Sequence, residues 1–268
     1  MMYLVKAEMI KILKSKSVWI IWLFLIFLGF LLIRKFDVLD TYADIFYKIE
    51  GSIPLIGLIM FIITSGNYIK EYDSNMTGLI NTTKKGKKSV VLSKLVANGL
   101  ILSIINISFI LLVGIRGFSF FDFKNLNEPI HNLWYFGNSN LNLTVIQMYI
   151  IVILTTIFAS FIFAQIGLTL SSIFKSAVIP FILGGLIMAI PYFSVGFIPD
   201  KAIKFMSVTP NWIMMSQQMV RYNVPSILIV FSIVISIILM IVLTKITYEN
   251  FTSSKRFLLK IIVILFIF

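Results

Sequence analysis

The sequence has no cysteine and little charge. Disulfides therefore cannot contribute to its fold, and charged side chains make up only 13% of the 268 residues, against 59% hydrophobic ones. Soluble domains carry about 25% charged residues, whereas long apolar runs need lipid around them. The composition excludes a soluble domain and indicates a polytopic membrane protein.

Charge is also missing from the interior of the long apolar runs. Each run is continuously apolar rather than alternating, which predicts membrane-spanning helices instead of barrel strands. We expect an all-α fold, with one six-span transmembrane domain covering residues 1–268. The expected spans are residues 17–33, 53–69, 95–115, 145–170, 177–198 and 224–244.

Catalytic and ion-carrying groups are absent from these runs as well. No Asp, Glu, Lys or Arg lies in the middle of an expected span, which argues against a proton-coupled carrier and less strongly against a sodium-coupled one. The sequence contains no H-E-x-x-H zinc motif and no G-x-S-x-G elbow. Its one histidine, His131, falls in an expected outer loop. We therefore expect no enzyme activity, no catalytic residue and no metal site.

The basic residues present are unevenly distributed. With the N-terminus inside, fifteen of the 23 Lys and Arg residues fall on the cytoplasmic side, together with only four of the 11 acidic residues. This bias predicts a multi-pass protein of the bacterial cytoplasmic membrane with both termini in the cytoplasm. The positive charge then faces anionic lipid headgroups, and we expect no nucleic acid partner.

Residues 81–89, "NTTKKGKKS", look at first like a phosphate-binding loop. The motif G-x-x-x-x-G-K-[ST] needs a first glycine and a final hydroxyl, but Asn81 and Lys88 occupy those positions when Gly86 is the second glycine. The sequence thus predicts no bound nucleotide and no cofactor on this chain. Instead, we expect a short helix after Asp73 or Ser74, a left-handed stop at Gly86, and Ser89 capping the next helix.

The N-terminal segment predicts an amphipathic helix at the membrane surface. Val5, Met9, Ile12 and Leu13 fall on one arc, while Lys11, Lys14 and Ser15 fall on the other. The alternative is a basic lead that only sets the topology.

These features together resemble the permease subunit of type-2 ABC exporters, closest in style to antibiotic-peptide or bacteriocin export and immunity permeases. The features are a basic N-terminal helix, two spans, an acid followed by "TGL", a glycine–lysine turn and "LSKL". The Thr77-Gly78 order inverts the commonest family version. The matching positions are Glu71, Thr77, Gly78, Leu79, Gly86 and Lys94.

The resemblance implies a division of labour between chains. A separate cytosolic ABC ATPase would hold ATP and Mg²⁺, and a coupling helix within residues 71–83, with apolar Met76, Leu79 and Ile80, would dock into it. A second permease, identical or related, would complete the pathway for a peptide, drug or lipid-like substrate. The alternatives are a solvated hairpin in place of the coupling helix, and a non-transporting membrane anchor, sensor or assembly protein.

Two further groups of residues are candidate pathway elements. Residues 207–223 predict a short outer helix that serves either as a gate, as in similar permeases, or as an interfacial anchor; its candidates are Pro210, Trp212, Met215 and Met219. Polar residues within or near the spans either line a pathway or form hydrogen bonds between helices, and the second role is the commoner. They are Asn67, Asn98, Asn106 and Gln165. The hydrophobic tail, residues 257–268, is too short to span unaided.

Overall fold

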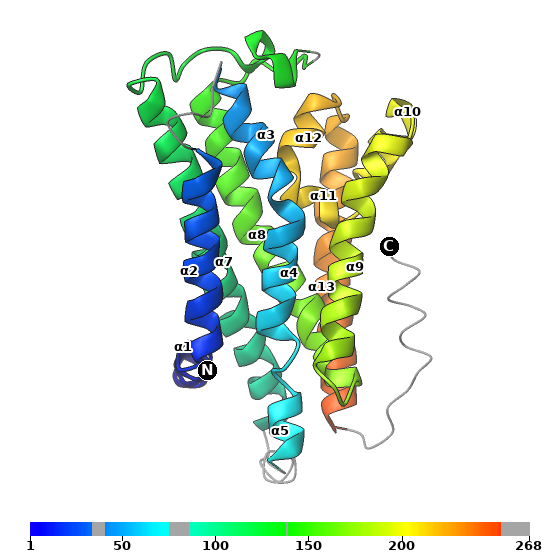
Figure 1. Cartoon of the computed structure of the whole chain (residues 1–268). Coiled ribbons are helices and arrows are strands. Elements are labelled where there is room, and N and C mark those ends of the chain that lie inside the picture. The colour runs from blue at the N-terminus through cyan, green and yellow to red at the C-terminus, as the bar shows by residue number, and fades with distance from the viewer. Residues whose placement is uncertain (34–40, 75–85, 138, 253–268) are drawn as a thin grey trace.

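The computed structural model describes residues 1–33, 41–74, 86–137 and 139–252, and this part of the chain folds as a bundle of helices (Figure 1). No strand occurs among the described residues, where the nearest feature is an isolated bridge between Pro129 and Thr144. The expected all-α fold is therefore confirmed.

The helices differ greatly in length. The α-helices are α1 (Met2–Leu13), α2 (Lys16–Leu32), α3 (Ala43–Gly51), α4 (Ile53–Thr64), α5 (Ile69–Asp73), α7 (Gly86–Phe120), α8 (Val145–Ile173), α9 (Val178–Ser194), α10 (Asp200–Met206), α11 (Asn211–Met214), α12 (Ser216–Arg221) and α13 (Ser226–Thr252). Three 3₁₀ turns are η1 (Ile130–Asn132), η2 (Trp134–Phe136) and η3 (Val195–Phe197).

Four of these elements are each long and apolar enough to cross a membrane: α7, α8, α9 continued by η3, and α13. Two further crossings are added if α1 with α2, and α3 with α4, are each counted as one bent span. The described residues thus hold four to six membrane-crossing elements. The exact count of six stays a prediction.

Helix α7 is longer than the sequence predicted. It begins at Gly86, so Ser89 lies inside the helix instead of capping it. No described glycine has a positive φ, and the expected left-handed stop at Gly86 is therefore wrong. The backbone turns left-handed just after the other end of α7, at Asp122 and Phe123, where the Phe123 N–H donates to the Phe118 carbonyl at 2.9 Å.

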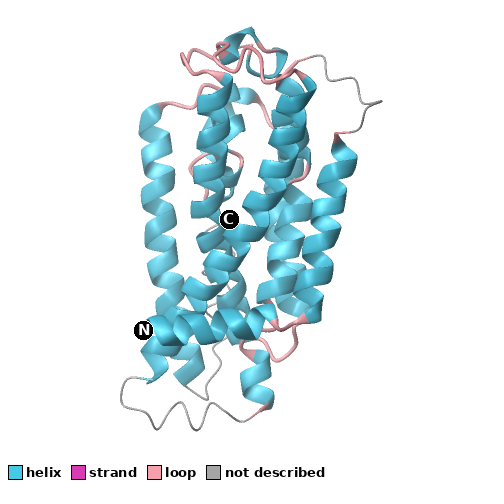
Figure 2. Cartoon of the chain, turned by 90° about the vertical axis from the view of Figure 1, so that its left-hand side faces the viewer, coloured by secondary structure: helices cyan, strands magenta, loops and turns pink. Residues whose placement is uncertain are grey.

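Helix α1 lies across one end of the bundle. Its axis turns by 72° from that of α2, and Figure 2 shows it running almost horizontally across the lower part of the bundle. Ile12 is buried and Val5 and Met9 are half-buried, as the predicted apolar arc requires, but Leu13 is exposed. We call this the α1 end, and the opposite end, which carries α10, α11 and α12, the α10 end.

The bundle is packed most closely where α7 meets α8. Gly114 of α7 leaves no room for a Cβ because the Tyr149 side chain of α8 occupies that space. The Tyr149 hydroxyl in turn donates to the Ile110 carbonyl at 2.8 Å. Small residues such as glycine let two helices approach closely in a membrane, and a hydrogen bond between them adds to the contact.

Candidate functional site

A group of four charged residues, centred on the buried Lys94, joins three helices at the α1 end. The Lys94 amine of α7 lies 2.8 Å from a carboxylate oxygen of Glu71 in α5 and 3.0 Å from one of Glu8 in α1. The Lys11 amine of α1 lies 3.1 Å from the same Glu71 oxygen and 3.9 Å from Glu8. We call these four residues the ion-pair cluster; its two positive and two negative charges balance.

The centre of this cluster is buried, which distinguishes it from an ion pair on the protein surface. The Lys94 side chain is 0% exposed and that of Glu71 is 7% exposed. An ionised group costs several kcal/mol to bury unless opposite charges and hydrogen bonds compensate it. The Lys94 amine also lies 3.5 Å from the Asn67 carbonyl oxygen and 5.3 Å from the centre of the Tyr68 ring. Lys94 is thus coordinated on several sides and holds α1 and α5 against α7.

Two members of the cluster were not predicted as site residues. Glu8 and Lys11 were assigned only to a basic surface helix, although Glu8 is the sole acid in the first 33 residues. It lies three positions before Lys11, which places both side chains on one helix face. An isolated acid within a basic helix is the signal in the sequence that could have indicated a buried partner for Glu8.

The predicted docking residues have mixed outcomes. Glu71 and Lys94 are brought together, but inside the protein rather than on a surface open to a partner. Gly86 starts α7. The remaining five, Met76, Thr77, Gly78, Leu79 and Ile80, lie outside the described residues, so the coupling helix stays a prediction.

The four polar residues proposed for a pathway all bond between helices. Asn67 donates to the Asn98 side chain at 3.0 Å, and Asn106 donates to Ser160 at 3.0 Å. Gln165 donates to Thr247 of α13 at 3.0 Å. All four residues are buried; Asn67 lies between α4 and α5, and the other three occur at different depths along α7 and α8. The geometry favours the packing role that the sequence allowed.

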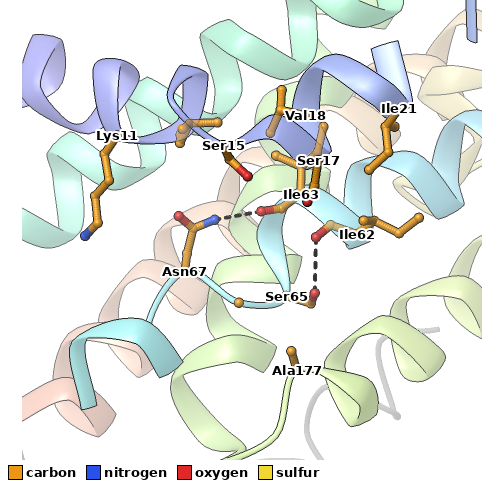
Figure 3. A pocket seen from close by; sticks show the side chains of 12 residues that line it. Lys11, Ser15, Ser17, Val18, Ile21, Ile62, Ile63, Ser65, Asn67 and Ala177 are labelled. Atoms are coloured by element: carbon orange, nitrogen blue, oxygen red, sulfur yellow. Dashed lines mark hydrogen bonds between the residues drawn. The ribbon is translucent and has the colours of Figure 1, made fainter. Parts of the chain in front are cut away.

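A cavity of about 220 Å³ lies beside the ion-pair cluster. Figure 3 shows it between the α1–α2 bend, which carries Ser15 and Ser17, and the end of α4, with Ala177 on a third side. The nearby Asn67 and Ser65 side chains are already bonded to carbonyl oxygens of α4, at 3.0 and 3.3 Å. The cavity leaves space between α1 and α4 that close packing would otherwise fill.

A second polar cluster occupies the α10 end. Glu50, expected in an outer loop, instead lies one residue before the end of α3, where α3 bends by 42° into α4. It is 8% exposed and accepts hydrogen bonds from the Tyr135 hydroxyl and the Gln218 amide. The Arg221 guanidinium stacks 4.7 Å from the centre of the Tyr135 ring. These four residues form the glutamate cluster.

Neutral donors dominate the glutamate cluster. Burial, followed by the charge of Glu50, raises the pKa of Tyr135 well above its usual value. Its hydroxyl therefore keeps its proton at neutral pH and continues to donate to Glu50. The cluster connects α3, the loop turn η2 and α12, so it spans three segments that are far apart in the sequence.

The expected outer helix is broken into two. Helices α11 and α12 meet at Met215, whose φ of −103° and ψ of 41° are not helical. The predicted gate residues are buried here: Trp212 is 0% exposed, Met215 1% and Met219 5%, and Pro210 precedes α11. Figure 1 shows both short helices beside α8 and α13 within the bundle. An anchor lying flat on a membrane surface does not fit this burial.

Several buried polar atoms in this broken segment have no hydrogen-bond partner among the described residues. Neither amide atom of Gln217 is bonded, although the side chain is 0% exposed, and the indole N–H of Trp212 is also unpaired. A buried polar group without a partner costs about 1–3 kcal/mol. The α11–α12 segment is therefore the least satisfied part of the described interior.

Neither cluster is suited to hold a metal. Among the described residues, no group of three or more His, Cys, Asp or Glu side chains converges on one point. Comparison with known proteins gives no assignment, since no family model and no curated protein matches the chain.

Proposed function

We propose that this chain is the transmembrane subunit of an ATP-driven exporter of the type-2 ABC class. A separate cytosolic ATPase would supply the energy and hold the ATP and Mg²⁺. The substrate class is a peptide, drug or lipid-like molecule taken from the cytoplasm or the inner leaflet. A second permease, identical or related, would complete the pathway.

The ion-pair cluster is the observation that carries this proposal. An ATPase can drive a permease only if the segment it contacts is mechanically connected to the spans. The segment that follows α5 and precedes α7 is the expected docking site, and Lys94 connects both of its flanking helices and α1 through ion pairs at 2.8 and 3.0 Å. A force on that segment would therefore reach α7 directly.

The broken α11–α12 segment supports the same proposal at the other end. A gate must change between two conformations. Buried polar atoms without hydrogen-bond partners make the conformation seen here less stable than one in which those atoms are bonded. Trp212 and Gln217 supply such atoms. We assign this segment the role of the outer gate.

A second candidate function is a non-transporting anchor, sensor or assembly protein. The observation that favours it is the pairing of Asn67 with Asn98 and of Asn106 with Ser160. These amides are bonded to other side chains, and of the four residues only Asn67 lines the cavity at the α1 end. This alternative predicts a partner but no ATP-dependent movement of a substrate.

The decisive experiment is purification of the tagged chain in mild detergent from its native membrane. We expect an ATPase with a phosphate loop to copurify in stoichiometric amount. Replacing Met76, Leu79 and Ile80 together by Ser should release it, because the apolar face of the coupling helix is lost. Copurification of no ATPase with the intact chain would reject the exporter proposal and favour the anchor.

A matched control keeps this experiment interpretable. Phe123, Trp134 and Leu141 are exposed apolar residues at the α10 end, and replacing all three by Ser removes a comparable apolar surface from the opposite end. This variant should retain the ATPase. If both triple variants lose it equally, general damage to the protein explains the result and the docking assignment fails.

Orientation has a separate test. Because the sequence has no cysteine, a single cysteine at Lys14 or at Phe123 can be labelled in whole cells with a maleimide that does not cross membranes. We expect labelling at position 123 and none at position 14 until the cells are opened. The reverse pattern would place both termini outside and overturn the cytoplasmic docking site.

A further inference from the structure

A groove of about 550 Å³ lies between α7 and α13 near the α1 end. Helix α7 begins at this end and helix α13 ends there, so the two run in opposite directions (Figure 1). Lys88 and Leu92 of α7 line one wall. Ile241 and Lys245 of α13 line the other. The groove is separate from the ion-pair cluster, with which it shares no residue.

Both walls carry the same two kinds of side chain in the same order along the groove. Residues four apart lie on one face of a helix, so each wall carries a lysine and, one turn away, an apolar side chain. Since the helices are antiparallel, both lysines lie toward the α1 end and both apolar residues lie deeper in the bundle. Thr244 and Tyr248 add two hydroxyl groups on the α13 wall.

The charge of the groove is net positive. Lys88 and Lys245 are exposed, and the structure records no ion pair between either lysine and a described acidic residue. Glu249 also lines the groove, which leaves a net charge of one positive unit. Ile241 is 63% exposed directly beside this charged rim. An amphipathic ligand with an anionic head and an apolar body complements such a surface.

We propose that this groove is a binding site for one anionic phospholipid. The headgroup phosphate would lie between the amines of Lys88 and Lys245, with the Tyr248 hydroxyl as a further donor. The ester region would reach Thr244, and an acyl chain would follow Leu92 and Ile241. The site depends only on the membrane location of the chain, and it holds whether or not an ATPase drives transport.

Native mass spectrometry of the full chain tests the site. The chain is equilibrated with phosphatidylglycerol and phosphatidylcholine in equal amounts, and the lipids retained on the protein are counted. We expect preferential retention of one phosphatidylglycerol. Replacing both Lys88 and Lys245 by Gln should lower its retention about tenfold or more, since each lysine near an anionic headgroup contributes on the order of a fivefold change.

A charge-matched control distinguishes a site from a general attraction. Lys14 and Lys16 are exposed at the same end of the bundle but outside the groove. Replacing both by Gln removes the same charge and should lower retention less than twofold. An equal loss in the two double variants would mean that the lipid responds only to overall charge, which overturns the proposal.

A blocking variant tests the apolar half. Ile241→Trp fills the groove while both lysines remain, and we expect phosphatidylglycerol retention to fall as it does in the double lysine variant. Ile238→Trp, at another exposed position of α13 outside the groove, is the control and should have no effect. Unchanged retention in Ile241→Trp would overturn the proposed path of the acyl chain.

Two other occupants give different results. If millimolar inorganic phosphate displaces phosphatidylglycerol completely, the site recognises an anion without a lipid body. If Ile241→Trp changes the oligomeric state and leaves the lipid bound, the groove is an interface between copies of the chain. Either result would replace the lipid assignment.

Discussion

The two polar clusters of this protein solve the problem of buried charge in different ways. At the α1 end, two carboxylates and two amines pair at distances of 2.8 to 3.9 Å. At the α10 end, the single carboxylate of Glu50 is held by the neutral donors Tyr135 and Gln218. The first cluster balances charge with charge, whereas in the second the direct hydrogen bonds to the carboxylate come from neutral donors, and the Arg221 guanidinium stacks on the Tyr135 ring at 4.7 Å.

From this difference between the clusters we infer which end of the bundle can change conformation more easily. A balanced ion-pair network has a steep cost for separation, because each charge left behind stays buried. Hydrogen bonds from neutral donors are worth only about 1 kcal/mol each and can be exchanged for others. The unpaired amide of Gln217 belongs to the residue next to Gln218 in α12. The α1 end is thus the rigid connection, and the α10 end is the part that can rearrange.

Lys94→Met should give the largest effect. It leaves Glu8 and Glu71 without their central cation, and breaking a buried pair costs about 3–5 kcal/mol. We expect strong loss of folded protein on heating, measured by size-exclusion chromatography of the detergent-solubilised chain. The triple change Lys94→Met, Glu8→Gln and Glu71→Gln should recover part of the stability, because the one charge that remains, on Lys11, lies on a side chain that is 45% exposed to solvent. No recovery would show that the buried charges left by Lys94→Met do not explain its effect.

Glu50→Leu should have an intermediate effect. It leaves the Tyr135 hydroxyl and the Gln218 amide without their acceptor, and the expected loss is about 2 kcal/mol. Glu50→Gln keeps an acceptor oxygen and should lose less than half as much, measured by the same heating series. A larger loss for Glu50→Gln than for Glu50→Leu would mean that the charge itself is essential, and the contrast drawn between the clusters would fail.

Gln217→Leu should stabilise the protein by about 1 kcal/mol, since it removes a buried amide whose two polar atoms have no described partner while keeping the volume similar. In the exporter proposal the same change should slow transport, because the arrangement seen here becomes harder to leave. Heating of the variant measures the first effect, and substrate-stimulated ATP hydrolysis by the assembled complex measures the second. Destabilisation would show that Gln217 is satisfied in the membrane.

Lys11→Gln should have the smallest effect, below about 1 kcal/mol, because the Lys11 side chain is 45% exposed and exposed ion pairs contribute little. High salt should reduce even this difference, whereas the Lys94→Met effect should persist at high salt. Equal effects of the two lysine variants would remove the distinction between a buried centre and a solvated edge of the cluster.

The membrane character and the helical fold were predictable because long apolar runs have few physical solutions. Helix α8 begins at Val145, as expected, where Thr144 and Gln147 form a capping box. The start of α7 was missed because Gly86 was read as a helix stop and Ser89 as a cap, whereas Val91 packs in the interior as part of a continuous helix.

The site was only partly predictable. Glu71 and Lys94 were recognised, but from a pattern along the chain, which does not reveal that Glu8 returns from α1 to complete their charges. Glu50 was assigned to an outer loop because it is a charged residue between the first two apolar runs. The positions of Glu8 and Glu50 both depend on contacts between segments that are distant in the sequence. Rules that use only neighbouring residues cannot predict such contacts.

The length of α7 gives the molecule a mechanical property. Its 35 residues correspond to a rod of about 52 Å, well beyond the roughly 30 Å of a hydrocarbon core, and it contains no proline that would act as a hinge. Lys94, which connects α7 to α1 and α5 by ion pairs, lies about 12 Å from the start of this helix. In the exporter proposal, a small tilt imposed at Gly86 would move the rod as a lever, with its fulcrum at the buried lysine and its far arm ending at Phe120, at the α10 end of the bundle.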